Sequence, residues 1–137
     1  MNKAFAIDTN IAIYAFADDE KRLIADKLVG NAPAISVQLL NEFANVIQRK
    51  RLAGPEKLTR MLSELAYAAL SVRVVDLAVH KQALRLTSLH NLSFFDALIV
   101  SAALLDGCAI LYSEDMQHGL VIEDQLRIVN PFEESSV

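Results

Sequence analysis

The feature that most constrains the fold is an alternation of short apolar runs with segments of helical periodicity. Runs of three or four residues rich in Ala, Val and Ile are typical of strands buried on both faces of a parallel sheet. Five such runs occur, at 4–7, 33–35, 72–75, 109–112 and 127–129. Helical patterns lie between them, at 37–50, at about 56–69, from Asp76 to about Leu89 and from Ser93 to Asp106. This alternation predicts an α/β fold with a mostly parallel central sheet that has helices on both faces.

Length and composition indicate one compact domain. The 137 residues, 53% of them hydrophobic, fit a single domain over 1–137, with 133–137 expected as a flexible tail. Thirteen Lys and Arg against 17 Asp and Glu give a net charge of -4, so a nucleic-acid partner would need a local basic patch. We expect no secretory signal, no membrane span and, because the single Cys108 looks like a small buried hydrophobe, a cytoplasmic location.

Four acidic residues are expected to meet at one edge of the sheet. In such folds each helix begins at the edge where a strand's carboxyl end emerges, and ligands bind along that edge. Asp8 directly follows the first apolar run, and Glu42 lies within two turns of the start of the helix after the second run. The helix that carries Asp96 rises roughly 19 Å and the strand behind it returns roughly 16 Å, which brings Asp115 back to the same edge.

Each acid also has an ordinary structural explanation. Asp96 lies three residues after Ser93, which is capping-box spacing, and a negative charge is favourable in the first turn of a helix. Asp8 could cap a helix that begins at the next residues. Glu42 falls on a polar stripe that could be a solvated helix face, and the acids of "YSEDMQHG" could belong to a turn.

The coincidence of four acids at one edge favours a cation. Carboxylates about 4 Å apart repel by ~4 kcal/mol per pair at an effective dielectric of 20, and no Lys or Arg is obviously placed among them. The sequence offers no Cys or His pairing for zinc, whereas an all-oxygen set suits Mg²⁺ or Mn²⁺. Such ions serve phosphodiester hydrolysis. Arg49, Lys50 and Arg51 are the candidates for a basic rim that contacts RNA, although a solvated helix end would explain them too.

Four segments together carry a family resemblance that spans about residues 4–132. They are "AFAIDTNIAIYAF", "SVQLLNEFANVIQRK", "LSFFDALIVSAALLDGCAILYSEDMQHG" and "LRIVNPF". In this order they resemble the acidic motifs of the PIN domain family, and in particular the toxin ribonucleases of VapBC toxin-antitoxin pairs. The resemblance implies an α/β/α sandwich, an endoribonuclease that depends on Mg²⁺ or Mn²⁺, a homodimer, and neutralisation by a cognate VapB-like antitoxin.

The same resemblance assigns roles to individual residues. The catalytic and metal-binding acids become Asp8, Glu42, Asp96 and Asp115. Asn10 and Ser113 are expected to support them, and Glu114 could share the role of Asp115. Thr9, by its place directly after Asp8, could also cap the helix or orient Asp8.

Other functions stay open at this point. A phosphatase or phosphoacceptor domain could use Asp8, but "DTN" supplies no second Asp two positions on. A PIN nuclease of RNA processing outside a toxin-antitoxin pair, or a non-catalytic partner that binds a metal or a basic peptide, would carry similar acids. Apolar helix residues could form a dimer or antitoxin groove, although the core is the commoner place for them: Tyr14, Phe16, Leu58, Met61 and Leu65.

Overall fold

A mostly parallel sheet forms the centre of the molecule. The structure is a computed structural model that describes residues 4–133. Within these residues six strands form one sheet in the order β3-β2-β1-β4-β6-β5, parallel throughout except for β5 against β6. The strands are β1 Phe5–Ile7, β2 Ala34–Ser36, β3 Ser71–Arg73, β4 Ile110–Tyr112, β5 Val121–Ile122 and β6 Leu126–Val129.

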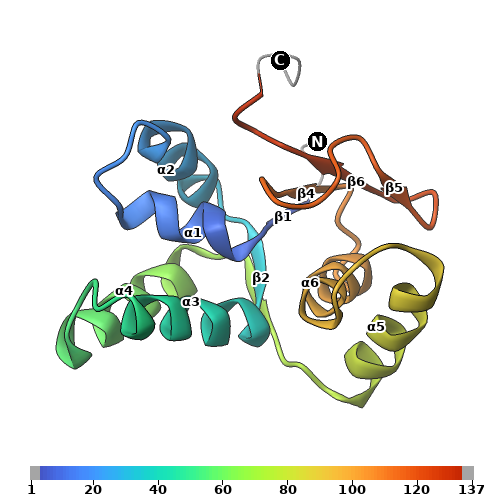
Figure 1. The fold of residues 1–137 in the computed structure, drawn as a ribbon, viewed down its shortest axis with the longest axis horizontal. Helices are drawn as coiled ribbons and strands as arrows, with labels where there is room; N and C mark the ends of the chain where they lie inside the picture. The colour runs from blue at the N-terminus through green and yellow to red at the C-terminus, as the bar shows by residue number, and fades with distance from the viewer. Residues whose placement is uncertain (1–3, 134–137) are drawn as a thin grey trace.

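Helices pack on both sides of this sheet. They are α1 Thr9–Phe16, α2 Arg22–Gly30, α3 Val37–Arg49, α4 Pro55–Ala68, α5 Leu77–Leu89 and α6 Phe94–Leu105. Helices α1 to α4 gather on one side of β1 and β2, and α5 and α6 lie on the other (Figure 1). The predicted α/β/α sandwich with a mostly parallel sheet is therefore confirmed. The predicted flexible tail lies, apart from Glu133, outside the described residues.

The first residues of helices were the most predictable features, because an N-cap side chain bonds to a backbone N–H only a few residues away. The side chains of Asp76 and Ser93 accept the N–H groups of Val79 and Asp96, at 3.0 and 3.1 Å, and so begin α5 and α6. Helix α6 ends at Leu105 rather than Asp106, which is its C-cap before Gly107 at a φ of 73°.

Two elements were not predicted. Helix α2 follows a loop of acidic residues; Ala25 is its only buried residue, and Leu23 is 81% exposed. Strand β5 is only two residues long and belongs to a hairpin with β6. Glu123 and Asp124 both adopt a positive φ in the hairpin turn, as a type I′ turn requires.

Helix α6 forms the middle of the hydrophobic core. Every side chain from Ala97 to Leu104 is buried, and the helix packs against α5, α3 and β2. Full burial of a Leu, Ile or Val side chain stabilises the fold by roughly 1.5–3 kcal/mol, so this helix is a large contributor. In the described part of the chain no single helix is long and apolar enough to span a membrane; only α5 and α6 together, bent by 117°, meet the length and composition test.

Candidate active site

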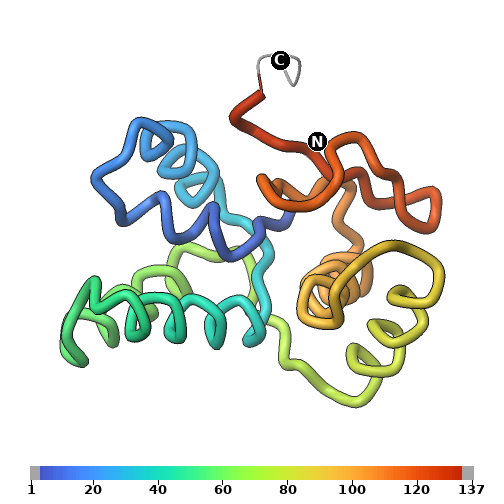
Figure 2. Tube along the Cα trace, viewed as in Figure 1, coloured from blue at the N-terminus to red at the C-terminus, as the bar shows by residue number. Residues whose placement is uncertain are grey.

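The carboxyl ends of β1, β2 and β4 bring the predicted acids to one edge of the sheet. Strands β1 and β4 pair in parallel near the centre of the chain trace (Figure 2), and the Asp8 N–H donates to the Tyr112 carbonyl at 2.9 Å. Helix α3 starts at the end of β2, with Ser36 as its N-cap. The expectation from strand topology, that distant acids converge here, therefore agrees with the backbone arrangement.

Asp8 is the most buried of the four acids, with 6% of its surface exposed. Its Oδ1 accepts the Thr9 N–H at 2.7 Å, which makes it the N-cap of α1, and its Oδ2 accepts the Ser113 hydroxyl at 2.9 Å. Burial raises the pKa of Asp8 to about 6; these two hydrogen bonds oppose the shift, and the negative charges of Asp96 and Asp115 add to it. Asp8 therefore caps α1 and also lies at the sheet edge where the sequence predicts the acids to meet.

Glu42 reaches the same edge from the second turn of α3. Its Oε2 accepts a hydrogen bond from the Thr9 hydroxyl at 3.0 Å. Because the backbone N–H of Thr9 donates to Asp8, this one residue contacts both acids. Half-burial raises the pKa of Glu42 to about 7, and the charges of Asp8 and Asp96 contribute to the shift. The polar stripe on α3 is therefore only partly a solvated face.

Asp96 and Asp115 complete the set of acids. Burial raises the pKa of Asp96 above its ordinary value, and the charge of Asp115 adds to the shift. Asp115 itself is exposed and accepts a short hydrogen bond from the Asn10 amide. Asp96 and Asp115 line a common pocket of about 520 Å³. Four carboxylates therefore share this edge, and, in addition to burial, the charge of Asp115 raises the pKa of both Asp8 and Asp96.

Glu114 has other partners. Its Oε1 accepts the Tyr14 hydroxyl at 2.7 Å, and its Oε2 forms an ion pair with Lys21. Burial by itself would raise the pKa of Glu114, but the hydrogen bonds from Lys21 and Tyr14 outweigh it and hold this pKa below its usual range. The Lys21 ammonium also lies 4.9 Å from the centre of the Tyr14 ring and 5.2 Å from that of Phe132. These contacts do not favour the predicted sharing of Asp115's role.

Sequence reasoning did not single out Tyr14 and Lys21 as neighbours of the site. They lie 100 and 93 positions from Glu114 in the sequence. No local spacing signals such a pairing, because it depends on how the segment before α2 packs against the loop after β4.

The basic residues lie at the far end of α3. Arg49, Lys50 and Arg51 are all exposed, and the helix leads away from the sheet toward them (Figure 1). Arg49 is seven residues beyond Glu42, or roughly 10 Å along the helix axis. The three residues therefore lie outside the acidic cluster.

Most of the apolar residues considered for a dimer or antitoxin groove are not available at the surface. Leu58, Met61 and Leu65 are buried in the core, whereas Tyr14 and Phe16 are only partly buried against it. Core packing explains the first three residues fully.

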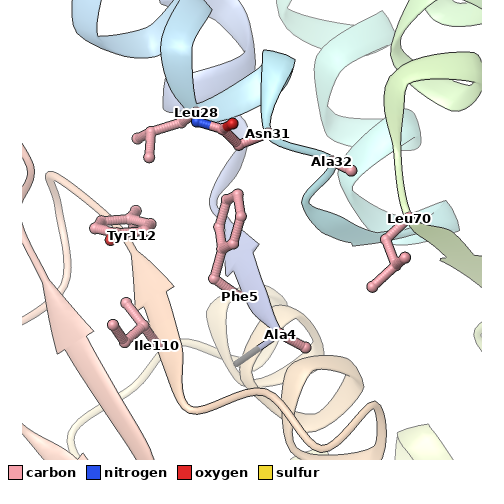
Figure 3. Close-up of a pocket in the computed structure, with 8 residues that line it drawn as sticks. All are labelled: Ala4, Phe5, Leu28, Asn31, Ala32, Leu70, Ile110 and Tyr112. Carbon is pink, nitrogen blue, oxygen red and sulfur yellow. The ribbon is translucent and has the colours of Figure 1, made fainter. Parts of the chain in front are cut away.

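A different pocket, of about 580 Å³, lies on the sheet below α2. Phe5 and Tyr112 project into it from β1 and β4, under Leu28 (Figure 3), with ring centres 5.7 Å apart. None of its eight lining residues is charged. It therefore offers no groups for acid–base or metal chemistry, and the smaller pocket at Asp96 and Asp115 is the chemically relevant one.

The acids fit a hard divalent cation as a donor set, although they do not form a ready-made cage. Across residues 4–133, no three Asp, Glu, His or Cys side chains are arranged to hold a metal ion directly. Within the same range no Lys, Arg or His forms an ion pair with any of the four acids. Mg²⁺ usually keeps several waters and uses only one or two carboxylates, so an uncompensated all-oxygen cluster of this kind suits it.

Comparison with known proteins identifies the family. The family model for the PIN domain matches residues 5–120, a range that includes all four acids. This chain belongs to the PIN domain family. No match is found among curated protein sequences.

Solved structures share this PIN fold at low sequence identity. A chain of a toxin-antitoxin complex from Klebsiella pneumoniae superposes with a TM-score of 0.72 at 20% identity, covering 95% of this chain and 98% of that one. VapBC2 from Rickettsia felis, bound to a DNA fragment from its promoter, gives 0.67 at 17% identity, covering 93% and 99%. VapC20 from Mycobacterium tuberculosis, described as a toxin that cleaves the Sarcin-Ricin loop, gives 0.62 at 21% identity, covering 82% and 90%.

Proposed function

We propose that this PIN domain is an endoribonuclease that hydrolyses RNA phosphodiester bonds with Mg²⁺ or Mn²⁺ held by Asp8, Glu42, Asp96 and Asp115. The observation that carries the proposal is the cluster itself. Burial and mutual repulsion raise the pKa of Asp8, Glu42 and Asp96, and no cationic side chain among residues 4–133 pairs with them. A folded protein keeps such a costly arrangement where a ligand compensates it.

The bound cation would supply positive charge for the phosphate and the Lewis acidity that makes water a nucleophile at neutral pH. Hydrogen bonds from neighbouring side chains and one backbone N–H orient the acids. Thr9 and Ser113 hold Asp8 and Glu42 by hydrogen bonds, and Asn10 holds Asp115. Water attacks phosphorus, one phosphorus–oxygen ester bond breaks, the proton released by the water passes to a carboxylate, and the departing ribose oxygen takes a proton from solvent. Glu42 is our candidate acceptor, because its carboxyl is half-buried and burial raises its pKa to about 7.

We further propose that the chain acts in the cytoplasm as a homodimeric toxin neutralised by a VapB-like antitoxin. The support is the likeness to toxin-antitoxin complexes, together with the motif resemblance. A basic antitoxin side chain placed among the acids would substitute for the cation. Growth arrest on expression, relieved by Asp8→Asn or by co-expression of a small DNA-binding protein encoded beside it, would separate a toxin from a nuclease of RNA processing.

RNA cleavage by the purified, antitoxin-free chain tests the proposal. We expect cleavage of a structured RNA with Mg²⁺ or Mn²⁺, loss of cleavage in EDTA, and loss in Asp8→Asn and Asp96→Asn. Asp124→Asn is the matched control, since Asp124 is exposed in the β5–β6 turn and Asn tolerates its positive φ. Cleavage that persists in EDTA, or in both site variants, would overturn the mechanism.

A further inference from the structure

The pocket beside Asp96 and Asp115 extends the site in one direction. Its other walls come from residues 89–92, at the end of α5 and in its connection to α6, and from residues 116, 117 and 120 after β4. A volume of about 520 Å³ is within the range of pockets that enclose small organic ligands, roughly 300–1,000 Å³. Because two of the four acids belong to its lining, a nucleotide next to a phosphate held by those acids would lie at the pocket's mouth.

The negative charge of the pocket lining determines which kind of group the pocket can bind. The lining contains two carboxylates and no Lys or Arg. A phosphate group would be repelled by Asp96 and Asp115 in such a pocket, whereas an uncharged nucleobase would not. Leu92 and the buried Met116 offer apolar surface for the faces of a base. The pocket is therefore suited to a base rather than to the RNA backbone.

Three polar side chains in the lining have no structural partner. His90, Asn91 and Gln117 form no side-chain hydrogen bond with any residue in the described range 4–133. His90 ends α5 through its backbone N–H, which donates to the Leu86 carbonyl at 2.9 Å, so its ring is not needed for the cap. An amide or imidazole presents both donors and acceptors, which can match the edge of a base.

We propose that this pocket binds the base adjacent to the cleaved bond and that His90, Asn91 and Gln117 determine which base is accepted. The inference rests on the proposed ribonuclease function for its biological meaning. Binding of a base by the pocket can be tested separately from cleavage. The side chains act as specificity determinants, while the acids carry the chemistry.

Nucleoside titration tests the pocket without activity. Adenosine, guanosine, cytidine, uridine and inorganic phosphate are each added at millimolar concentration to the full chain in EDTA, with amide NMR signals as the readout. We expect one nucleoside to shift signals of residues 89–92 and 115–120 more than the others, and phosphate to leave them unchanged. No response to any nucleoside, or the same response to phosphate, would overturn the proposal.

Cleavage-site mapping on random-sequence RNA gives the second readout. Asn91→Ala and Gln117→Ala should reduce the preference for one base beside the cut by about tenfold while cleavage continues. Asn31→Ala is the matched control, because Asn31 lies before β2, at the opposite edge of the sheet, and lines a different pocket. An unchanged preference in both variants contradicts the assignment even if RNA is cleaved. Absence of cleavage by the unmodified chain would instead reject the ribonuclease proposal, and the nucleoside titration would still decide the pocket.

Discussion

The hydroxyl of Ser113 donates a 2.9 Å hydrogen bond to Oδ2 of Asp8, although 105 positions separate the two residues in the sequence. Ser113 is fully buried, and its oxygen also accepts the Met116 N–H at 3.1 Å. The loop that presents Asp115 is thus fixed to the carboxylate that follows β1. One buried serine therefore holds the loop after β4 against the acid that follows β1.

Replacing this serine should change the acidity of Asp8. In Ser113→Ala the pKa of Asp8 should rise above its present value of about 6, because the lost hydrogen bond lowers it. The acidic limb of the cleavage pH profile should move to higher pH, and the free energy of unfolding should fall by about 1–3 kcal/mol. Ser101→Ala is the control: Ser101 is also buried, and its hydroxyl lies 2.9 Å from the Val79 carbonyl. Identical pH profiles in the two variants would contradict this role.

The cation-free protein should lose stability as pH rises. The folded-state pKa values of Asp8 and Glu42, about 6 and about 7, lie above their ordinary 3.8 and 4.5, so between about pH 4 and 7 the folded state keeps protons that the unfolded state releases. The free energy of unfolding contributed by these groups therefore falls across this range. For buried Asp8, roughly two units at about 1.4 kcal/mol each set an upper bound of about 3 kcal/mol.

Denaturant unfolding in EDTA between pH 4 and 8 measures this loss, and Asp8→Asn should flatten the slope. Added Mg²⁺ should restore stability near neutral pH, because a ligand that binds only the folded state stabilises it. A slope that is the same in Asp8→Asn would show that Asp8 is not the group that titrates.

Replacing Asp115 and Glu114 one at a time should separate their roles. Asp115→Asn should reduce cleavage by more than about 100-fold, since loss of a residue that only supports a metal ligand already costs ~10–100-fold. Glu114→Gln should reduce cleavage only several-fold but lower Tm by a few degrees, because it weakens the contacts with Tyr14 and Lys21. Cleavage assays and thermal unfolding of both variants distinguish the two effects. Equal losses of cleavage would restore the shared role that the sequence suggested.

Arg49 should contribute to RNA binding without contacting the acids. Arg49→Ala should weaken binding and reduce the slope of log K against log salt by about 1, the effect of one lost phosphate contact. Fluorescence anisotropy in EDTA measures binding without cleavage. Arg127→Ala, which removes another exposed arginine on β6, should leave the slope unchanged. If both substitutions have the same effect, the α3 end is merely solvated.

The sequence alone was sufficient for features that depend on neighbouring residues or on strand topology. Ser93 and Asp76 begin helices because a capping side chain bonds to a backbone N–H three residues away. The meeting of Asp8 and Asp115 at one edge follows from the rule that parallel strands end together. Helix α2 and strand β5 were not predicted: α2 has nine residues and buries only Ala25, and β5, with two residues, is too short to show a period.

Only the tertiary structure decided how the acids are supported and what lies beside them. Thr9 bonds to Glu42, Asn10 to Asp115, and Lys21 and Tyr14 to Glu114, across 33 to 105 positions. Such contacts arise from the packing of α1 between α3 and the loop after β4, and no local pattern encodes them. The pocket formed by residues 89–92, 96, 115–117 and 120 also depends on side-chain packing between distant segments. The sequence predicted which carboxylates reach the sheet edge, because the carboxyl ends of parallel strands lie at one edge. Side-chain packing decided which of them are buried and held by hydrogen bonds, and in which of them burial raises the pKa.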